Sequence, residues 1–181
     1  LAGWLLTHAA SDHPVVICGD KEMDFLPCLF GVLKSGRAYV PIDSAVPADR
    51  VAQILEDVTP SAVVDFTGKL DPGEIPLLHQ EDLEIILAAP TEQVPGGCWV
   101  SGEDTVYILF TSGSTGRPKG VSITAENLAA FAEGVAHWYP EQGGVILHQI
   151  SYSFDVSGCA VYAGLSHGMT LFTVDHEMVA D

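Results

Sequence analysis

The sequence predicts an α/β fold, in which a mostly parallel β-sheet is flanked by helices. Short runs of β-branched and aromatic residues alternate along the chain with stretches whose apolar residues recur at helical spacing. The 181 residues are 48% hydrophobic, which is enough for a substantial core. The 18 glycines follow no triplet period, so a fibrous protein is excluded.

The first half of the chain is expected to alternate strands and helices. Residues 1–13 are typical of the end of an apolar-striped helix, and they contain no basic region of a signal peptide. Strands are predicted at 14–19, 38–42 and 62–66. A helix is predicted over 21–35, ending at Gly36, with an apolar face of Met23, Leu26, Leu29, Phe30 and Leu33. A second helix ends before Pro60 and carries Val51, Ile54, Leu55 and Val58. Elements in this order build a parallel sheet through right-handed crossovers.

The second half is predicted to continue this alternation after an irregular segment. Residues 67–104 are rich in proline, glycine and acids, which indicates a surface excursion with one short strand near 75–78. Strands are predicted at 105–111, 120–123, 144–150 and 169–174, and a helix at 155–167. Thr124 can cap a further helix, which carries Leu128, Phe131, Val135 and Trp138. His148 lies in the strand at 144–150, where a plain strand residue is favoured over a catalytic base.

Charge and cysteine usage narrow the function. With 24 acidic and 7 basic residues, the net charge of −17 excludes nucleic acid and anionic membranes as partners. No apolar run approaches the roughly 18 residues of a membrane span, so membrane insertion is not expected. The four cysteines form no CxxC pair and no HExxH motif occurs, which predicts no metal site and a cytoplasmic protein with reduced thiols.

A glycine-rich segment, YILFTSGSTGRPKG (107–120), holds all the basic residues that follow residue 70, namely Arg117 and Lys119. Its glycines permit close approach of the backbone to an anion, its hydroxyls are donors, and Lys119 supplies a charge suited to phosphate. The segment therefore predicts a polyphosphate site, with a mobile serine and glycine turn as the alternative. It is not a Walker A loop, because Pro118 stands at the second glycine position.

Three motifs together resemble the adenylate-forming superfamily of acyl-CoA synthetases, luciferases and peptide-synthetase adenylation domains. They are TSGSTGRPKG (111–120), LKSGRAYVPID (33–43) and SFDVS (153–157). The resemblance implies that residues 1–181 are a partial N-terminal AMP-binding (adenylation) domain, truncated at both ends and without the C-terminal lobe. It implies ATP and Mg²⁺ as cofactors, and the fragment alone is expected to be inactive. Lys119 is the implied catalytic cation, and ATP would be bound by Thr111, Ser112, Gly113, Ser114, Thr115, Gly116 and Lys119.

The resemblance also indicates the substrate class. In amino-acid-activating relatives, the acid equivalent to Asp155 pairs with the substrate α-ammonium, although Asp155 could equally cap the helix after it. Val156 and Cys159 would line the side-chain end of the pocket, which favours a small or apolar amino acid.

Three segments resemble the subfamily of D-alanine–carrier protein ligases, which act in teichoic-acid biosynthesis: ENLAAFAEGVAHWYP (126–140), the glycine pair 143–144, and HQISYSFDVSGCAVYAGLSHGMTLF (148–172). That resemblance implies activation of D-alanine and its transfer to the phosphopantetheine thiol of a carrier protein. Two alternatives stay open. One is a peptide-synthetase adenylation domain for another small or apolar amino acid, and the other is a nucleotide-binding module without catalysis.

Overall fold

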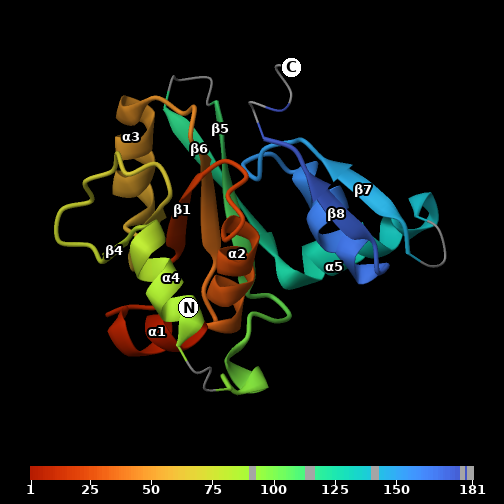
Figure 1. Ribbon diagram of the computed structural model, residues 1–181, viewed down its shortest axis with the longest axis horizontal. Helices are drawn as coiled ribbons and strands as arrows, with labels where there is room; N and C mark the ends of the chain where they lie inside the picture. The colour runs from red at the N-terminus through yellow and green to blue at the C-terminus, as the bar shows by residue number, and fades with distance from the viewer. Residues whose placement is uncertain (90–92, 113–116, 140–142, 176–177, 179–181) are drawn as a thin grey trace.

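A six-stranded sheet forms the centre of the protein (Figure 1). The computed structural model describes residues 1–89, 93–112, 117–139, 143–175 and 178. The strands lie in the order β4-β3-β1-β2-β5-β6, and only the β5–β6 pair is antiparallel. Their bounds are β1 Val15–Gly19, β2 Tyr39–Asp43, β3 Ala62–Asp65, β4 Leu77–Leu78, β5 Thr105–Ser112 and β6 Pro118–Thr124. The predicted mostly parallel sheet with flanking helices is confirmed.

Helices cover both faces of this sheet, because successive strand side chains point to opposite faces. In β1, Val15 and Ile17 pack into a core that also contains residues of several helices, and Val16 and Cys18 pack into a second core with residues of another helix. The helices on the first face are α1 (Ala2–His8), α2 (Phe25–Lys34) and α4 (Gln80–Ala88), and α3 (Ala48–Val58) lies on the second. All five residues of β1 are therefore apolar or glycine, as expected for a strand buried on both faces.

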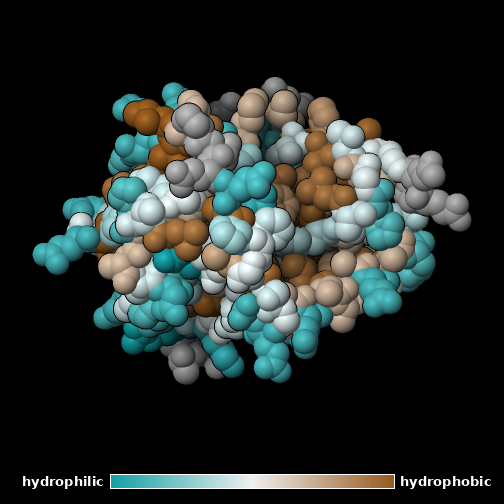
Figure 2. All heavy atoms as spheres, turned by 90° about the horizontal axis from the view of Figure 1, so that it is seen from below, coloured by the Kyte–Doolittle hydropathy of each residue, from teal (hydrophilic) through white to brown (hydrophobic). Residues whose placement is uncertain are grey.

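A second, two-stranded sheet stands beside the large one (Figure 1). It pairs β7 (Val145–His148) with β8 (Thr170–Thr173) in parallel, and the π-helix Cys159–Gly164 lies in the connection. Along the chain, α5 (Ala125–Gly134) and a 3₁₀ turn, Ala136–Trp138, connect the large sheet to the small one. Figure 2 shows apolar side chains gathered on the side of the molecule that carries these elements, where Val145, Leu147 and Phe172 are exposed.

The irregular segment 67–104 differs most from the prediction. It contains β4, which extends the sheet, and also α4, which the sequence did not predict. Leu83 is the buried residue of α4 whereas Ile85 is exposed, so the helix lacks a clear apolar stripe. A reciprocal capping box between His79 and Asp82 stabilises its first turn instead.

Several predicted boundaries also shift. α2 begins at Phe25 rather than at 21, so Met23 precedes the helix and is 92% exposed instead of facing the core. The predicted helix after Thr124 is α5, whose first turn Thr124 caps by accepting the Asn127 N–H at 3.2 Å, as expected. Trp138, however, lies past its end and is exposed. The helix predicted over 155–167 has the π-helix at its centre.

Gly36 ends α2 in a conformation that favours glycine. Its φ is +78°, and a Cβ there would stand 2.6 Å from the carbonyl oxygen of Cys98. The buried Arg37 beside it donates to the carbonyl oxygens of Ser11 and Ser35 at 3.0–3.1 Å. The Ser-Gly-Arg of the motif at 33–43 thus builds the turn that leads the chain into β2.

Candidate functional site

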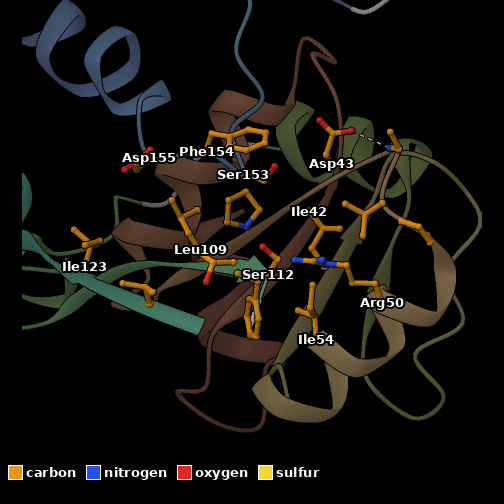
Figure 3. Close-up of a pocket in the computed structure, with 17 residues that line it drawn as sticks. Ile42, Asp43, Arg50, Ile54, Leu109, Ser112, Ile123, Ser153, Phe154 and Asp155 are labelled. Carbon is orange, nitrogen blue, oxygen red and sulfur yellow. Dashed lines mark hydrogen bonds between the residues drawn. The ribbon is translucent and has the colours of Figure 1, made fainter. Parts of the chain in front are cut away.

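A cavity of about 900 Å³ opens where β2 and β5 end, which is where parallel α/β sheets usually bind ligands (Figure 3). Its walls come from the last residues of both strands, the start of α3, β6, and the turn before the π-helix. Its lining residues include Asp43, Arg50, Leu109, Thr111, Ser112, Ile123, Ser153, Phe154 and Asp155. Motifs far apart in the sequence therefore share one cavity.

Thr111 and Ser112, two of the predicted phosphate ligands, are exposed and line this cavity. They are the last residues of β5, and they pair with Lys119 and Pro118 at the start of β6. The Thr111 hydroxyl donates to the carbonyl oxygen of Lys119 at 3.4 Å. The predicted ligands Gly113, Ser114, Thr115 and Gly116 lie outside the described residues. The end of β5, which leads into the glycine-rich loop, thus stands at the cavity wall.

The two basic residues of the glycine-rich segment have different partners. Arg117 forms ion pairs with Glu56 at 3.3 Å and Asp57 at 3.4 Å on α3. Lys119 is exposed and outside the cavity lining, but it lies directly opposite Thr111, so both side chains project from the same side of the ladder. Of these two, Lys119 is the cation that remains suited to a phosphate.

Arg50 is a cavity residue that the sequence did not single out. It sits in the first turn of α3, and Figure 3 shows its guanidinium reaching toward Ser112. Only the packing of α3 against the ends of β2 and β5 brings this charge to the cavity, so no local pattern could have marked it. The phosphate end of the candidate site therefore has a guanidinium beside its hydroxyls.

Asp155 lies at the opposite end of the cavity from Arg50 (Figure 3). Apolar side chains of Leu109 and Phe154 lie between them, and Ile123 also lines the cavity. The carboxylate is exposed, because it faces the open cavity rather than a closed pocket. Burial raises the pKa of the Tyr107 phenol, and the negative charge of Asp155 raises it further.

Asp155 also has a local structural role. Its Oδ1 accepts the Val156 N–H at 2.8 Å, and its carbonyl oxygen accepts the Gly158 N–H at 2.9 Å. The first bond joins adjacent residues, whereas an N-cap side chain accepts an N–H two or three positions further on, so both bonds support the turn and the capping alternative stays a prediction. A carboxylate accepts several hydrogen bonds at once, so this role leaves room for a ligand.

The structure does not bring Val156 and Cys159 to the cavity. Val156 is 46% exposed and is not among the described lining residues. Cys159 begins the π-helix, where its carbonyl oxygen accepts the Tyr139 hydroxyl at 2.5 Å. Their place at the side-chain end of a substrate pocket stays a prediction.

His148 lies at the end of β7, as predicted, and is 1% exposed. Among the described residues neither ring nitrogen has a hydrogen-bond partner. Burial, together with the charge of Lys21, lowers the pKa of His148 to about 4, so the ring is neutral near pH 7. His148 is buried and does not line the cavity, which favours a core residue over a catalytic base.

The cysteines are free, and Cys18 and Cys28 are buried. Burial raises the pKa of both thiols to about 12, so neither is a nucleophile at neutral pH. Within the described part of the chain, no three acidic, histidine or cysteine side chains are placed to hold a metal ion. The described helices include none long and apolar enough to cross a membrane.

Comparison with known proteins agrees with this architecture. The N-terminal subdomain of Klebsiella oxytoca NpsA superposes with a TM-score of 0.77 at 20% identity, covering 96% of this chain and 44% of that one. The nonribosomal peptide synthetase FmoA3, solved in an AMPPNP-bound form, gives a TM-score of 0.78 at 26% identity, covering 95% of this chain and 18% of that chain. The fold is therefore that of the N-terminal domains of adenylate-forming enzymes.

Sequence relatives extend the likeness to the whole chain. A D-alanine–D-alanyl carrier protein ligase of Bacillus licheniformis is 34% identical over 182 aligned positions, covering 99% of this chain and 36% of the relative. The chain thus spans about a third of the length of the curated relatives it matches. The family model described as AMP-binding enzyme matches residues 1–181. The protein therefore belongs to the AMP-binding enzyme family.

Proposed function

We propose that the protein activates a small amino acid, D-alanine foremost, with ATP and transfers it to the phosphopantetheine thiol of a carrier protein. The observation that carries this proposal is the polarity of the cavity. A carboxylate, Asp155, stands at one end, and the Arg50 guanidinium with the hydroxyls of Thr111 and Ser112 stands at the other. Such a cavity suits a substrate pair with an ammonium on one side and phosphates on the other.

In the first half-reaction, an oxygen of the amino-acid carboxylate attacks the α-phosphorus of ATP. The bond between this phosphorus and the oxygen that bridges to the β-phosphate breaks, and pyrophosphate leaves with the electron pair. Donors placed beforehand around the phosphates stabilise the charge that develops there. We assign this role to Thr111, Ser112 and Lys119, and on sequence grounds also to Gly113, Ser114, Thr115 and Gly116.

In the second half-reaction, the carrier thiol loses its proton and its sulfur attacks the carbonyl carbon of the adenylate. The bond from this carbon to the phosphate oxygen breaks, and AMP is released. Asp155 would hold the ammonium of the aminoacyl group in both steps. This charge pair would distinguish an amino acid from a plain carboxylic acid of the same skeleton.

Mg²⁺ is proposed to enter with ATP. Mg²⁺ is usually held by substrate phosphates and one or two carboxylates rather than by a complete protein site. The described residues fit this mode, because the hard hydroxyl oxygens of Thr111 and Ser112 line the cavity. The ion would neutralise phosphate charge there.

We also propose that residues 1–181 are part of an N-terminal adenylation lobe, and that a polypeptide of these residues alone forms no adenylate. The support is that the matched relatives are about three times as long, since the chain covers 36% of the Bacillus licheniformis ligase. The buried free thiols of Cys18 and Cys28 support a reducing location such as the cytoplasm.

A second candidate function is that of a peptide-synthetase adenylation domain for another small amino acid. The likeness to FmoA3 supports it, but that likeness is 26% identical, against 34% for the D-alanine ligase. A nucleotide-binding module without catalysis is the third reading, and the acidic end of the cavity argues against it.

The test is amino-acid-dependent exchange of pyrophosphate into ATP by the intact protein, with D-alanine, L-alanine, glycine and propionate compared. Exchange that depends on D-alanine supports the proposal. Exchange with another small amino acid would favour the peptide-synthetase reading. Binding of ATP without exchange for any of them would leave the non-catalytic module.

A further inference from the structure

The turn that carries Asp155 is attached to the large sheet by a lysine. Lys21 follows the carboxyl end of β1 and precedes α2, far from this turn in the sequence. Its Nζ donates to the carbonyl oxygen of Ile150 at 2.5 Å and lies 4.2 Å from the centroid of the Tyr152 ring. One ammonium therefore contacts the chain both by a hydrogen bond and by a cation–π contact, directly before Asp155.

Tyr152 is itself locked into the core of the large sheet. Tyr152 is 6% exposed, and its ring stacks on that of Phe25 of α2, with the centroids 4.6 Å apart and the planes at 6° to each other. The His148 ring packs against the same ring in an edge-on arrangement, with the centroids 4.7 Å apart. The Tyr152 side chain is thus held by Phe25 of α2 and by His148 of the small sheet, and Lys21 contacts the same ring.

The turn after Tyr152 is short and internally bonded. The Phe154 N–H donates to the Ser151 carbonyl oxygen at 3.1 Å, and the Ser153 N–H donates to the Ser151 hydroxyl at 3.3 Å. Ser153, Phe154 and Asp155 line the cavity directly after these bonds. A displacement at residues 150–152 would therefore move the cavity-lining residues with it.

The partly buried position of Lys21 changes the pKa of its ammonium. Burial lowers the pKa of Lys21 to about 8, against the opposing effect of the acids Asp20, Asp43 and Glu22. The ammonium is partly desolvated, and contacts with the Ile150 carbonyl oxygen and the Tyr152 ring replace the lost water. His148, whose ring is neutral near pH 7, adds no competing positive charge at this junction.

We propose that Lys21 is a positioning residue for the amino-acid end of the site. Its ammonium holds the turn of residues 151–155 to the carboxyl edge of the large sheet, and so sets where the Asp155 carboxylate stands in the cavity. We call the contacts of Lys21 with Ile150 and Tyr152 the tether. The catalytic consequence of the tether rests on the proposed function, but the tether itself does not.

The experiment compares Lys21→Met and Lys21→Gln, which remove the charge, with Lys21→Arg, which keeps a charged donor. Lys34→Met is the matched control, because Lys34 also contacts an aromatic ring, that of Trp99 at 5.2 Å, but lies at the far end of α2. Hydrogen exchange of residues 150–156 in the intact protein is measured first. The KM and kcat for D-alanine and for ATP are measured second.

We expect both neutral variants to accelerate exchange in residues 150–156 about tenfold, as loss of a charge-assisted hydrogen bond implies. The KM for D-alanine should rise about tenfold while the KM for ATP stays unchanged, because the strand ends at the phosphate side are not tethered by Lys21. Lys21→Arg, which keeps a charged donor, should show hydrogen exchange and a KM for D-alanine close to those of the wild type. Lys34→Met should change neither.

The outcomes separate the two proposals. Unchanged exchange in residues 150–156 of a folded neutral variant would overturn the tether, whatever the activity. Faster hydrogen exchange with an unchanged KM for D-alanine would overturn the link between the tether and the amino-acid end of the site. A wild-type protein without amino-acid-dependent activity would overturn the proposed function, while faster exchange in the variants would still support the tether.

Discussion

The change Asp155→Asn tests the choice of substrate class most directly. Asparagine keeps an oxygen that can accept the Val156 N–H, a bond of 2.8 Å, but it removes the negative charge. If Asp155 only supports the turn, this variant should resemble the wild type. If it pairs with a substrate ammonium, selectivity for the amino acid should fall while stability is retained.

The exposure of Asp155 limits the size of the effect. A charge stranded in a dry interior would cost about 3–5 kcal/mol, but Asp155 faces an open cavity of about 900 Å³. A hydrogen bond to a charged group is worth about 1.5–3 kcal/mol, which corresponds to about 10- to 150-fold in kcat/KM. We expect a loss in this range for D-alanine and almost none for propionate, which has no ammonium.

The assay is pyrophosphate exchange by the intact protein, with D-alanine and propionate in parallel and the melting temperature measured alongside. Asp155→Ala serves as the control for the turn. It also removes the acceptor for Val156, so it should lower stability by about 1 kcal/mol, or about 2–4 °C in Tm. An unchanged ratio of D-alanine to propionate turnover in Asp155→Asn would refute the anchoring role.

Three further predictions follow from other parts of the structure. Lys119→Ala should lower kcat/KM for ATP about a hundredfold, whereas Arg117→Ala, whose charge is paired with Glu56 and Asp57, should change it less than about twofold; equal effects would contradict the separation of roles. Gly36→Ala should destabilise the protein by about 1–2 kcal/mol or more in urea unfolding, because φ is +78° and its Cβ would meet the Cys98 carbonyl oxygen. Gly68→Ala, with φ at +66° but open space around it, is the control, and an equal loss there would exclude the contact as a cause. Because His148 has a pKa of about 4 when folded and an ordinary value near 6.5 when unfolded, the unfolded chain binds more protons between these values, so stability should fall with falling pH by up to about 1.4 kcal/mol per unit. His148→Leu should flatten this slope in urea unfolding between pH 6.5 and 4.5, and an unchanged slope would show that other groups cause it.

Local sequence patterns predicted the elements whose burial is regular. β1 is apolar throughout because it is covered on both faces, and α3 carries a clear stripe that includes the buried Val51 and Ile54. α4 escaped prediction because Leu83 is its buried residue and a capping box, rather than an apolar face, supports its start. The boundary of α2 was misplaced because Met23 fits the helical spacing although it precedes the helix.

For the site, the sequence determined the chemistry of the glycine-rich segment and of Asp155, since these depend on residue types in short motifs. Only the tertiary structure could decide which residues share a cavity. It brought Arg50 to the phosphate end of the cavity and paired Arg117 with an acid on α3. It also left Val156 and Cys159 outside the cavity lining and attached the turn of Asp155 to Lys21. The physical reason is that each of these contacts joins segments dozens of residues apart, and their meeting is set by the order of strands in the sheet and by the packing of helices on it.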